Sequence, residues 1–299
     1  MVDAVIPVVP TYELLDFGAA RKLERFGDWV LDRPAPGADG PQKNREVWKA
    51  ATARYDGDRA TEGTWTPGLK RWEHADVEFA VALSGDKQFQ LLLSPLPSGQ
   101  VGVFPEQLAN WEWIAKRACV SKSLAQAASQ RVLNLFAYTG GSTLAAASAG
   151  AEVTHVDAAK SMVARARENA EASGLADAPI RWIVEDALKF CQREVKRGNQ
   201  YDAVILDPPT YGHGPKGEAW SIKRDLLPLL ELCKQLTTGR LKFAICTCHT
   251  PGLGGAELSA YMSDGLFGHC GQPPQTGTLY LTTSDGRKLK SGTFARWPG

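Results

Sequence analysis

From residue 131 onwards, short runs of apolar residues alternate with longer segments in which apolar residues recur at helical spacing. The short runs are typical of buried strands, and the longer segments are typical of helices that cover a sheet. We expect strands over residues 132–137, 153–156, 180–184, 201–206 and 241–248, and helices over 142–149, 158–173, 187–196, 218–236 and 256–266. This alternation predicts an α/β fold with a mostly parallel, doubly wound sheet.

The first 118 residues follow a different pattern, in which Trp, Gly and Pro are spread among short alternating segments. The alternation predicts strands over 77–83 and 89–93. Pro105 suits the first position of a helix, and we expect a helix over 105–118. The chain is therefore expected to contain a small β-rich domain, residues 1–118, that ends in a connecting helix. The α/β domain, residues 119–299, is expected to close with two strands around the turn Asp285-Gly286.

Ligands of doubly wound sheets bind at the carboxyl ends of the strands, so the residues that follow the expected strands are candidates for a site. They are Tyr138-Thr139-Gly140, Asp157, Asp186, Asp207-Pro208-Pro209 and Cys248-His249. The loop after the first strand lacks the Gly-x-Gly-x-x-Gly pattern, which argues against NAD or FAD.

Each of the first candidates has a structural alternative. The glycine loop fits a ligand that approaches the backbone closely, and it fits a plain strand-to-helix turn equally well. Asp157 can accept hydrogen bonds from ribose hydroxyl groups, or it can cap the next helix. Asp186 can receive the amino group of an adenine, or it too can be a helix cap.

The segment Asp207-Pro208-Pro209-Thr210-Tyr211 is the most specific pattern in the chain. Two successive prolines make a stiff turn that lacks two N–H donors, which leaves their carbonyl groups to face a planar substrate. Tyr211 can stack on that substrate. We expect residues 212–217, which are rich in glycine, to form a flexible loop over the site.

Together these residues resemble the class I S-adenosylmethionine-dependent methyltransferases. The resemblance is strongest to the group that contains the large-subunit ribosomal RNA cytosine-C5 and guanine-N2 methyltransferases. It runs from about Gln88 to the C-terminus and is carried by Asn134-x-Phe136-x-Tyr138-Thr139-Gly140-Gly141, Asp157, Asp186 and Asp207-Pro208-Pro209. It implies a Rossmann-like, seven-stranded sheet, S-adenosylmethionine as cofactor with S-adenosylhomocysteine as product, and methylation of a base in structured RNA, with ribosomal RNA favoured.

The resemblance also implies a set of site residues. The first loop faces the methionine end of the cofactor, Asp157 holds the ribose, and Asp186 lies by the adenine. The cofactor-binding residues implied are Asn134, Phe136, Ala137, Tyr138, Thr139, Gly140, Asp157, Ala158, Asp186, Ala187 and Asp207. The catalytic residues implied are Asp207, Pro208, Pro209 and Cys248. The segment 98–107 resembles the strand and turn that lie near the active site in this group.

Two reactions stay open at this point. In the family's C5 enzymes, a cysteine after the fifth strand attacks C6 of the pyrimidine, which would make Cys248 a nucleophile beside His249, with Asp207 as an acid. Alternatively, the Pro208 carbonyl group accepts a proton of an exocyclic amine, and Cys248 is a buried core residue. This chain has Thr210-Tyr211 where the C5 enzymes usually carry Lys-Phe, and Thr247-Cys248-His249 where they carry Ser-Cys-Ser.

Composition limits the partners. The 34 basic and 33 acidic residues give a net charge of +1, so attraction to RNA must come from a local patch. Trp65 and Lys70-Arg71-Trp72 are candidates for that patch, but we favour the alternative that the aromatic residues of this region fill the core of the small domain. The six cysteines fit neither a disulfide framework nor a zinc site, and no metal is expected. No apolar run could span a membrane and no signal peptide is evident, which predicts a cytoplasmic protein.

Two other functions remain possible from the sequence. One is a methyltransferase that acts on a small molecule or a protein, and the other is a non-catalytic RNA-binding module with the same fold. The sequence gives no indication of the oligomeric state.

Overall fold

The computed structural model describes residues 12–57, 63–68, 78–83, 87–93, 95–119, 129–268 and 272–299. The chain forms two units and passes between them several times. The first unit comprises Met1–Val81, Leu91–Pro105 and Tyr280–Lys290, and the second comprises Ala82–Gln90, Glu106–Leu279 and Ser291–Gly299.

The first unit is built on a five-stranded sheet with the strand order β1-β2-β3-β4-β5. The strands are β1 (Tyr12–Gly18), β2 (Arg21–Phe26), β3 (Trp29–Pro34), β4 (Ala53–Asp56) and β5 (Thr64–Thr66), with a short helical turn η1 (Val47–Ala50) before β4. Neighbouring strands are antiparallel except β3 and β4. Ala19 and Ala20 join β1 to β2 with positive φ angles, as the favoured two-residue hairpin turn requires. The expected β-rich N-terminal region is therefore confirmed.

Trp65 belongs to the core of this unit. Its ring packs on Tyr55 with 5.2 Å between ring centroids, and its Nε1 donates a hydrogen bond to the Leu96 carbonyl group at 2.8 Å. Trp65 is therefore not a free surface for a nucleic acid. Lys70-Arg71-Trp72 lie outside the described residues. The expected strands near residues 77–93 are confirmed as a two-stranded sheet of β6 (Glu78–Ala82) and β7 (Gln88–Leu92).

The second unit is built on a seven-stranded sheet with the order β10-β9-β8-β11-β14-β16-β15. Its strands are β8 (Arg131–Leu135), β9 (Glu152–Asp157), β10 (Ile180–Val184), β11 (Ala203–Leu206), β14 (Phe243–Cys248), β15 (Gln275–Thr282) and β16 (Lys288–Trp297). The first five of these are mutually parallel, and β16 runs antiparallel to β14. This is the mostly parallel, doubly wound sheet that the sequence predicts, with its order reversing between β8 and β11.

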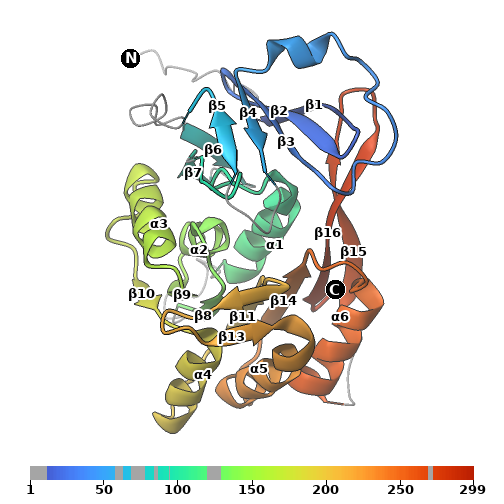
Figure 1. Ribbon diagram of the computed structural model, residues 1–299. Helices are drawn as coiled ribbons and strands as arrows, with labels where there is room; N and C mark the ends of the chain where they lie inside the picture. The colour runs from blue at the N-terminus through green and yellow to red at the C-terminus, as the bar shows by residue number, and fades with distance from the viewer. Residues whose placement is uncertain are drawn as a thin grey trace. The chain divides into compact units, whose positions relative to one another are not determined.

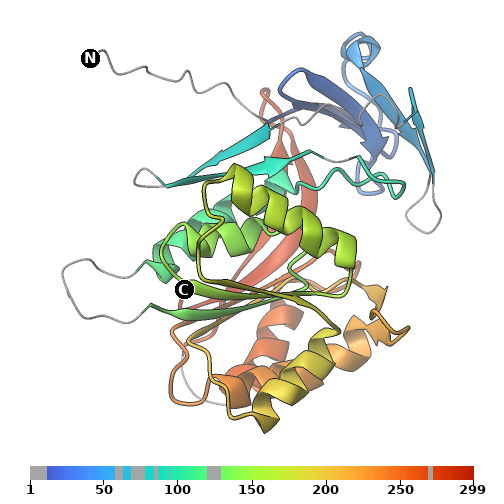
Figure 2. The same cartoon turned by 90° about the vertical axis from the view of Figure 1, so that its left-hand side faces the viewer.

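Helices cover both faces of this sheet (Figure 1). They are α1 (Leu108–Ala118, preceded by the turn η3, Pro105–Gln107), α2 (Gly141–Ala147), α3 (Lys160–Ala172), α4 (Ala187–Lys196), α5 (Ile222–Leu236) and α6 (Gly255–Met262), which continues into the π-helical turn η4 (Ser263–Phe267). Figure 2 shows α1, α2 and α3 on one face and α4, α5 and α6 on the other. The second group packs on the large apolar core formed with β8, β11 and β14.

Three expectations differ from the structure. The helix expected from residue 218 begins at Ile222, because Ala219–Ser221 form a strand, β13, paired with β12 (Tyr211–His213). The two strands around Asp285-Gly286, expected over 278–283 and 293–297, extend over Gln275–Thr282 and Lys288–Trp297. The helix α1, expected in the N-terminal domain, lies in the second unit, and the tip of the β15–β16 hairpin lies in the first.

Candidate functional site

The carboxyl ends of four parallel strands lie level at one edge of the large sheet. Leu135 of β8 is paired with Val156 of β9 and with Leu206 of β11, and Leu206 is paired with Cys246 of β14. The residues that directly follow these four paired positions therefore form a row across the sheet. That row consists of Asp157, Phe136, Asp207 and Thr247. The register brings together the candidates that the sequence places far apart.

The loop between β8 and α2 has an unusual backbone. Phe136 has a φ of 57°, Tyr138 of 50° and Gly140 of 92°. Non-glycine residues rarely adopt such angles, and they do so mainly where the surrounding structure enforces them, often at ligand sites. A Cβ atom at Gly140 would lie 3.2 Å from the Cβ atom of Ala166, so α3 leaves little room there.

Two side chains hold this loop through its main chain. Asn169 of α3 donates a hydrogen bond from Nδ2 to the carbonyl oxygen of Thr139 at 2.8 Å. The Oδ2 atom of Asp157 accepts from the backbone N–H of Tyr138 at 2.8 Å. Asn169 was not among the residues singled out from the sequence, because nothing in its helical context distinguishes it.

Asp157 is not the cap of α3. Its Oδ1 accepts from the N–H of Ala159 at 2.9 Å, and the helix begins at Lys160. Burial raises the pKa of this carboxyl group above its ordinary value, against the opposing effect of the two backbone hydrogen bonds. Each oxygen keeps a lone pair for a further donor, which suits a ribose hydroxyl group.

Asp186 caps α4, as its structural alternative predicted. Its Oδ1 accepts from the backbone N–H of Lys189 at 2.9 Å, and Ala187 is the first residue of the helix. No described residue donates a hydrogen bond to its Oδ2. Val184, the last residue of β10 and two residues before Asp186, has 41% of its surface exposed.

Asn134 lies beneath the loop in the interior. Its Nδ2 donates to the hydroxyl group of Thr143 at 2.8 Å, and that hydroxyl is 2.9 Å from Nδ1 of His155. Because the Thr143 oxygen accepts from Asn134, its proton is directed to Nδ1, and the neutral His155 carries its own proton on Nε2. Burial and the charge of Arg167 lower the pKa of His155 to about 3.

Asp207 lies directly after β11 and contacts the turn before α1. Gln107 donates from Nε2 to Oδ2 of Asp207 at 3.3 Å and to Oγ1 of Thr247 at 3.4 Å. The segment 98–107, expected near the active site, therefore reaches it through its last residue. Leu108 follows at once and is 48% exposed.

The two prolines after Asp207 have different environments. The Pro209 carbonyl oxygen accepts a hydrogen bond from Nε1 of Trp220 at 2.8 Å. No described residue donates to the Pro208 carbonyl oxygen. We expected both carbonyl groups to face a substrate, but that of Pro209 anchors the β12–β13 hairpin, whose Trp220 also packs on Phe136 with 4.8 Å between ring centroids.

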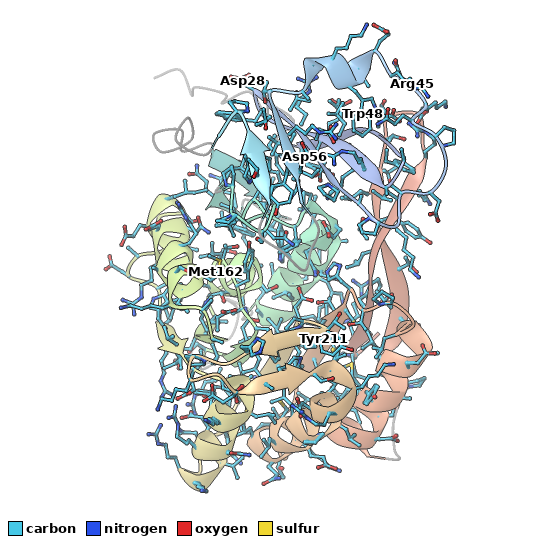
Figure 3. All side chains as sticks on the ribbon, viewed as in Figure 1. Asp28, Arg45, Trp48, Asp56, Met162 and Tyr211 are labelled. Atoms are coloured by element: carbon cyan, nitrogen blue, oxygen red, sulfur yellow. The ribbon has the colours of Figure 1, made fainter. Side chains whose placement is uncertain are left out.

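The β12–β13 hairpin replaces the flexible loop expected over residues 212–217. It projects from the carboxyl edge of the sheet in Figure 2, and an ion pair between Glu218 and Lys189 of α4 holds its tip. Hydrogen bonding to Lys189 lowers the pKa of Glu218 to about 2. Tyr211, labelled in Figure 3, is 75% exposed on this hairpin.

Cys248 lies on the opposite face of β14 from Thr247. Its side chain is 1% exposed, and its Sγ accepts a hydrogen bond from the N–H of Thr250 at 3.2 Å. Cys248 belongs to the apolar core together with Ala244 and Cys246, which share its face of the strand. Thr247, not Cys248, stands beside Asp207.

The described residues contain neither a metal site nor a membrane-spanning helix. No group of three or more His, Cys, Asp or Glu side chains is arranged to hold a metal ion. No helix in the described part of the chain is long and apolar enough to cross a membrane.

Comparison with known proteins identifies the class. Residues 113–254 match the family model of S-adenosylmethionine-dependent methyltransferases. The crystal structure of an S-adenosylmethionine-dependent methyltransferase from Agrobacterium tumefaciens shares 35% sequence identity with a TM-score of 0.80, covering 96% of this chain and 90% of that chain. The chain belongs to the S-adenosylmethionine-dependent methyltransferases, and S-adenosylmethionine is its cofactor.

Curated relatives carry names that specify ribosomal RNA. The chain is 38% identical to ribosomal RNA large subunit methyltransferase I of Aeromonas salmonicida over 96 residues, which are 32% of this chain and 24% of that protein. It is 36% identical to methyltransferase K/L of Shewanella baltica over 119 residues, which are 38% of this chain and 16% of that protein. The chain spans about half or less of the length of the curated relatives it matches.

Proposed function

We propose that this methyltransferase modifies an exocyclic amine of a base in RNA, with ribosomal RNA as the favoured substrate. The observation that carries the choice of atom is the pair of free acceptors after β11. Asp207 Oδ1 and the Pro208 carbonyl oxygen receive no hydrogen bond from the described residues, whereas Cys248 is turned into the core. An amine has two N–H groups to offer to two acceptors, and its methylation needs no nucleophilic cysteine.

The cofactor residues follow from the same edge. Asp157 would hold the ribose, Asp186 would receive the adenine amino group through its Oδ2, and the loop 136–140 would face the methionine end. When bound, S-adenosylmethionine supplies an electrophilic methyl group. Asn134 is assigned a supporting role beneath the loop, because its amide is bonded to Thr143.

The protein's own residues orient the acceptor. Asp207 and Pro208 each accept one N–H of the amine, which aims the nitrogen lone pair away from them and towards the methyl group. The nitrogen would gain a positive charge as its bond to the methyl carbon forms and the methyl–sulfur bond breaks, with S-adenosylhomocysteine as the leaving group. The carboxylate of Asp207 would stabilise that charge and take the proton. Positioning of this kind supplies a large part of the rate in displacement reactions.

RNA is favoured over a small molecule by the rim of the site and by the names of the relatives. Leu108 follows Gln107, which contacts Asp207, and Tyr211 begins the hairpin that follows the Asp207-Pro208-Pro209 turn; both side chains are exposed. Exposed aromatic and apolar groups stack on bases, and a target base must leave its helix to reach a group such as Asp207. The curated relatives are named as ribosomal RNA methyltransferases. The cytoplasmic location expected from the sequence stays a prediction.

The test uses methyl-labelled S-adenosylmethionine, the purified protein and total RNA from cells that lack the gene. The RNA is digested, and the labelled nucleoside is identified by mass spectrometry. We expect a nucleoside methylated on an exocyclic nitrogen. Labelled 5-methylcytidine would contradict the choice of atom, and RNA without label, from a protein that binds S-adenosylhomocysteine, would contradict RNA as the substrate.

The matched variants are Cys248→Ala and Asp207→Ala. Cys248→Ala should keep its rate within about threefold, because it removes only a core thiol, whereas Asp207→Ala should lose about 100-fold or more. A Cys248→Ala protein that binds cofactor but transfers no methyl group would restore Cys248 as a nucleophile.

A further inference from the structure

A short chain of amide side chains leads from α1 to Asp207. Asn110 of α1 donates from Nδ2 to Oε1 of Gln107 at 2.7 Å. Gln107 donates in turn from Nε2 to Asp207 and to Thr247. Asn110 is 1% exposed and Gln107 is 6% exposed, so water does not compete for these bonds.

The donors and acceptors at the two ends of this series of hydrogen bonds determine its direction. Oε1 of Gln107 is occupied by the N–H of Asn110, so its NH₂ group must face Asp207. A reversed Gln107 amide would set its oxygen against the Asp207 carboxylate and its NH₂ against that of Asn110. Thr247 is an acceptor for Gln107 because its own hydroxyl donates to the Leu206 carbonyl oxygen at 3.4 Å. Every contact of Gln107 therefore favours the same orientation.

This arrangement uses one oxygen of Asp207 and leaves the other. Gln107 bonds Oδ2, while Oδ1 receives no hydrogen bond from the described residues. The carboxylate is thereby fixed about its own torsion angle, with Oδ1 presented to a ligand. Without Gln107, the carboxylate could rotate, and each oxygen would spend part of its time in the wrong place.

We propose that Gln107, held by Asn110, is a positioning residue for methyl transfer that acts through Asp207. It fixes the carboxylate so that Oδ1 meets the acceptor group. The inference rests on the proposed function only in taking Asp207 as the group that contacts the methyl acceptor, and it does not depend on which acceptor that is.

The test is a double-mutant cycle of Gln107→Met and Asp207→Asn, measured by transfer of labelled methyl groups to the total RNA described above. Gln107→Met has similar volume and cannot donate a hydrogen bond. It should lower kcat about 10- to 100-fold with KM and S-adenosylhomocysteine affinity within about threefold, because it disturbs orientation and not binding. In the Asp207→Asn background, Gln107→Met should lower kcat by less than about threefold.

If the loss of kcat in the double variant equals the product of the losses in the two single variants, the proposal is overturned. A residue that acts only through Asp207 cannot have its full effect once the Asp207 carboxylate is gone. A loss of S-adenosylhomocysteine affinity in Gln107→Met as large as its loss of kcat would also overturn the proposal, because it would assign Gln107 to cofactor binding. If a small molecule or protein fraction of the cell takes up the labelled methyl group in place of RNA, the double-mutant cycle is measured with that acceptor. The proposal for Gln107 can then be supported or overturned even where RNA is not the substrate.

Two further measurements keep the inference testable whatever the acceptor. In Gln107→Glu, the introduced carboxyl group can still donate to Asp207 while it is protonated, whereas its ionised form repels Asp207. Methyl transfer by this variant should therefore fall as pH rises, beyond any change in the wild type, and a parallel pH profile would contradict the contact. Urea unfolding of the four proteins of the cycle should also show coupling between Gln107 and Asp207, and purely additive changes there would overturn the proposal without any activity measurement.

Discussion

Beneath the first loop, a histidine is buried without a charged partner. His155 has no exposed surface, its Nδ1 is bonded to Thr143, and its Nε2 has no hydrogen-bond partner among the described residues. Its ring packs on Trp182 with 4.9 Å between centroids. The side chain is stable here only in its neutral form, since a charged imidazole would be buried next to apolar groups and the cation of Arg167.

The low pKa of His155 makes stability depend on pH. The pKa is about 3 in the folded protein and about 6.5 in an unfolded chain, so only the unfolded state gains a proton between these values. Stability is therefore complete above pH 6.5 and falls by about 1.4 kcal/mol per pH unit below it. His155→Asn should show a shallower decline between pH 6.5 and 4.5 in urea unfolding.

The exposed His213 of β12 provides the control for this measurement. His213→Gln should leave the pH dependence of unfolding as in the wild type. Equal slopes for His155→Asn and the wild type would show that His155 is accessible to protons in the folded protein.

Among the elements, α1 and α2 meet at a glycine. A Cβ atom at Gly141 would lie 2.6 Å from Cζ2 of Trp111, which real contacts do not allow. Trp111 also packs on Phe89 with 5.6 Å between ring centroids, so its ring cannot easily move. The close approach places the start of α2, and with it the loop 136–140, against the helix that follows Gln107.

Gly141→Ala should therefore separate α1 from α2. We expect unfolding to become easier by about 1–3 kcal/mol, the usual effect of overpacking a well-packed core. The affinity for S-adenosylhomocysteine, measured by calorimetry, should fall as well. Gly37→Ala is the control, because a Cβ atom there would have only the Lys290 carbonyl oxygen, at 3.7 Å, within 4 Å among the described residues. A Gly141→Ala protein as stable as this control would show that α1 shifts to make room for the new methyl group.

The elements and the residues at the carboxyl edge of the large sheet were predictable where one physical rule dominates. Buried parallel strands are continuous apolar runs, so the five strands and the row at their carboxyl edge follow from the sequence. The β12–β13 hairpin does not, because Ala219–Ser221 are too short to show alternation, and their pairing is fixed by Trp220 bonding to Pro209. Asn169 could not be singled out from the sequence. Asn134 was expected to bind the cofactor, whereas its amide is bonded to Thr143, because only the structure shows where a buried amide finds its partner.

For the whole molecule, segments near both ends of the chain lie together in the first unit. Asp16 of β1 is fully buried and accepts hydrogen bonds from Arg287 at 2.7 Å, from Nε1 of Trp48 at 2.8 Å and from the backbone N–H of Asn44 at 3.1 Å. Burial opposes ionisation of this carboxyl group, but these donors and the backbone N–H of Phe17 outweigh it and lower its pKa. The tip of the β15–β16 hairpin is thus part of the N-terminal fold.

Removing that link should weaken the first unit. Arg287→Met removes one donor from the buried Asp16 carboxylate, and we expect a loss of about 1–3 kcal/mol in the stability of this unit, followed by tryptophan fluorescence in urea. Arg25→Met is the control, because Arg25 pairs with Glu13 at 3.6 Å on the surface and such pairs contribute about 0–1 kcal/mol. Equal stability of the two variants would mean that the buried Asp16 carboxylate is stabilised by its other donors, such as Trp48 and Asn44, without Arg287.

The alternation of side chains along β14 has a consequence for how such enzymes diverge. Thr247 meets Asp207 and Cys248 enters the core because successive residues of a strand point to opposite faces. A bulge that removed or added one residue before this point would exchange the two side chains. A thiol would then stand beside the carboxylate with no change of sequence at either position, so a single insertion could separate catalysis by orientation from catalysis by covalent attack.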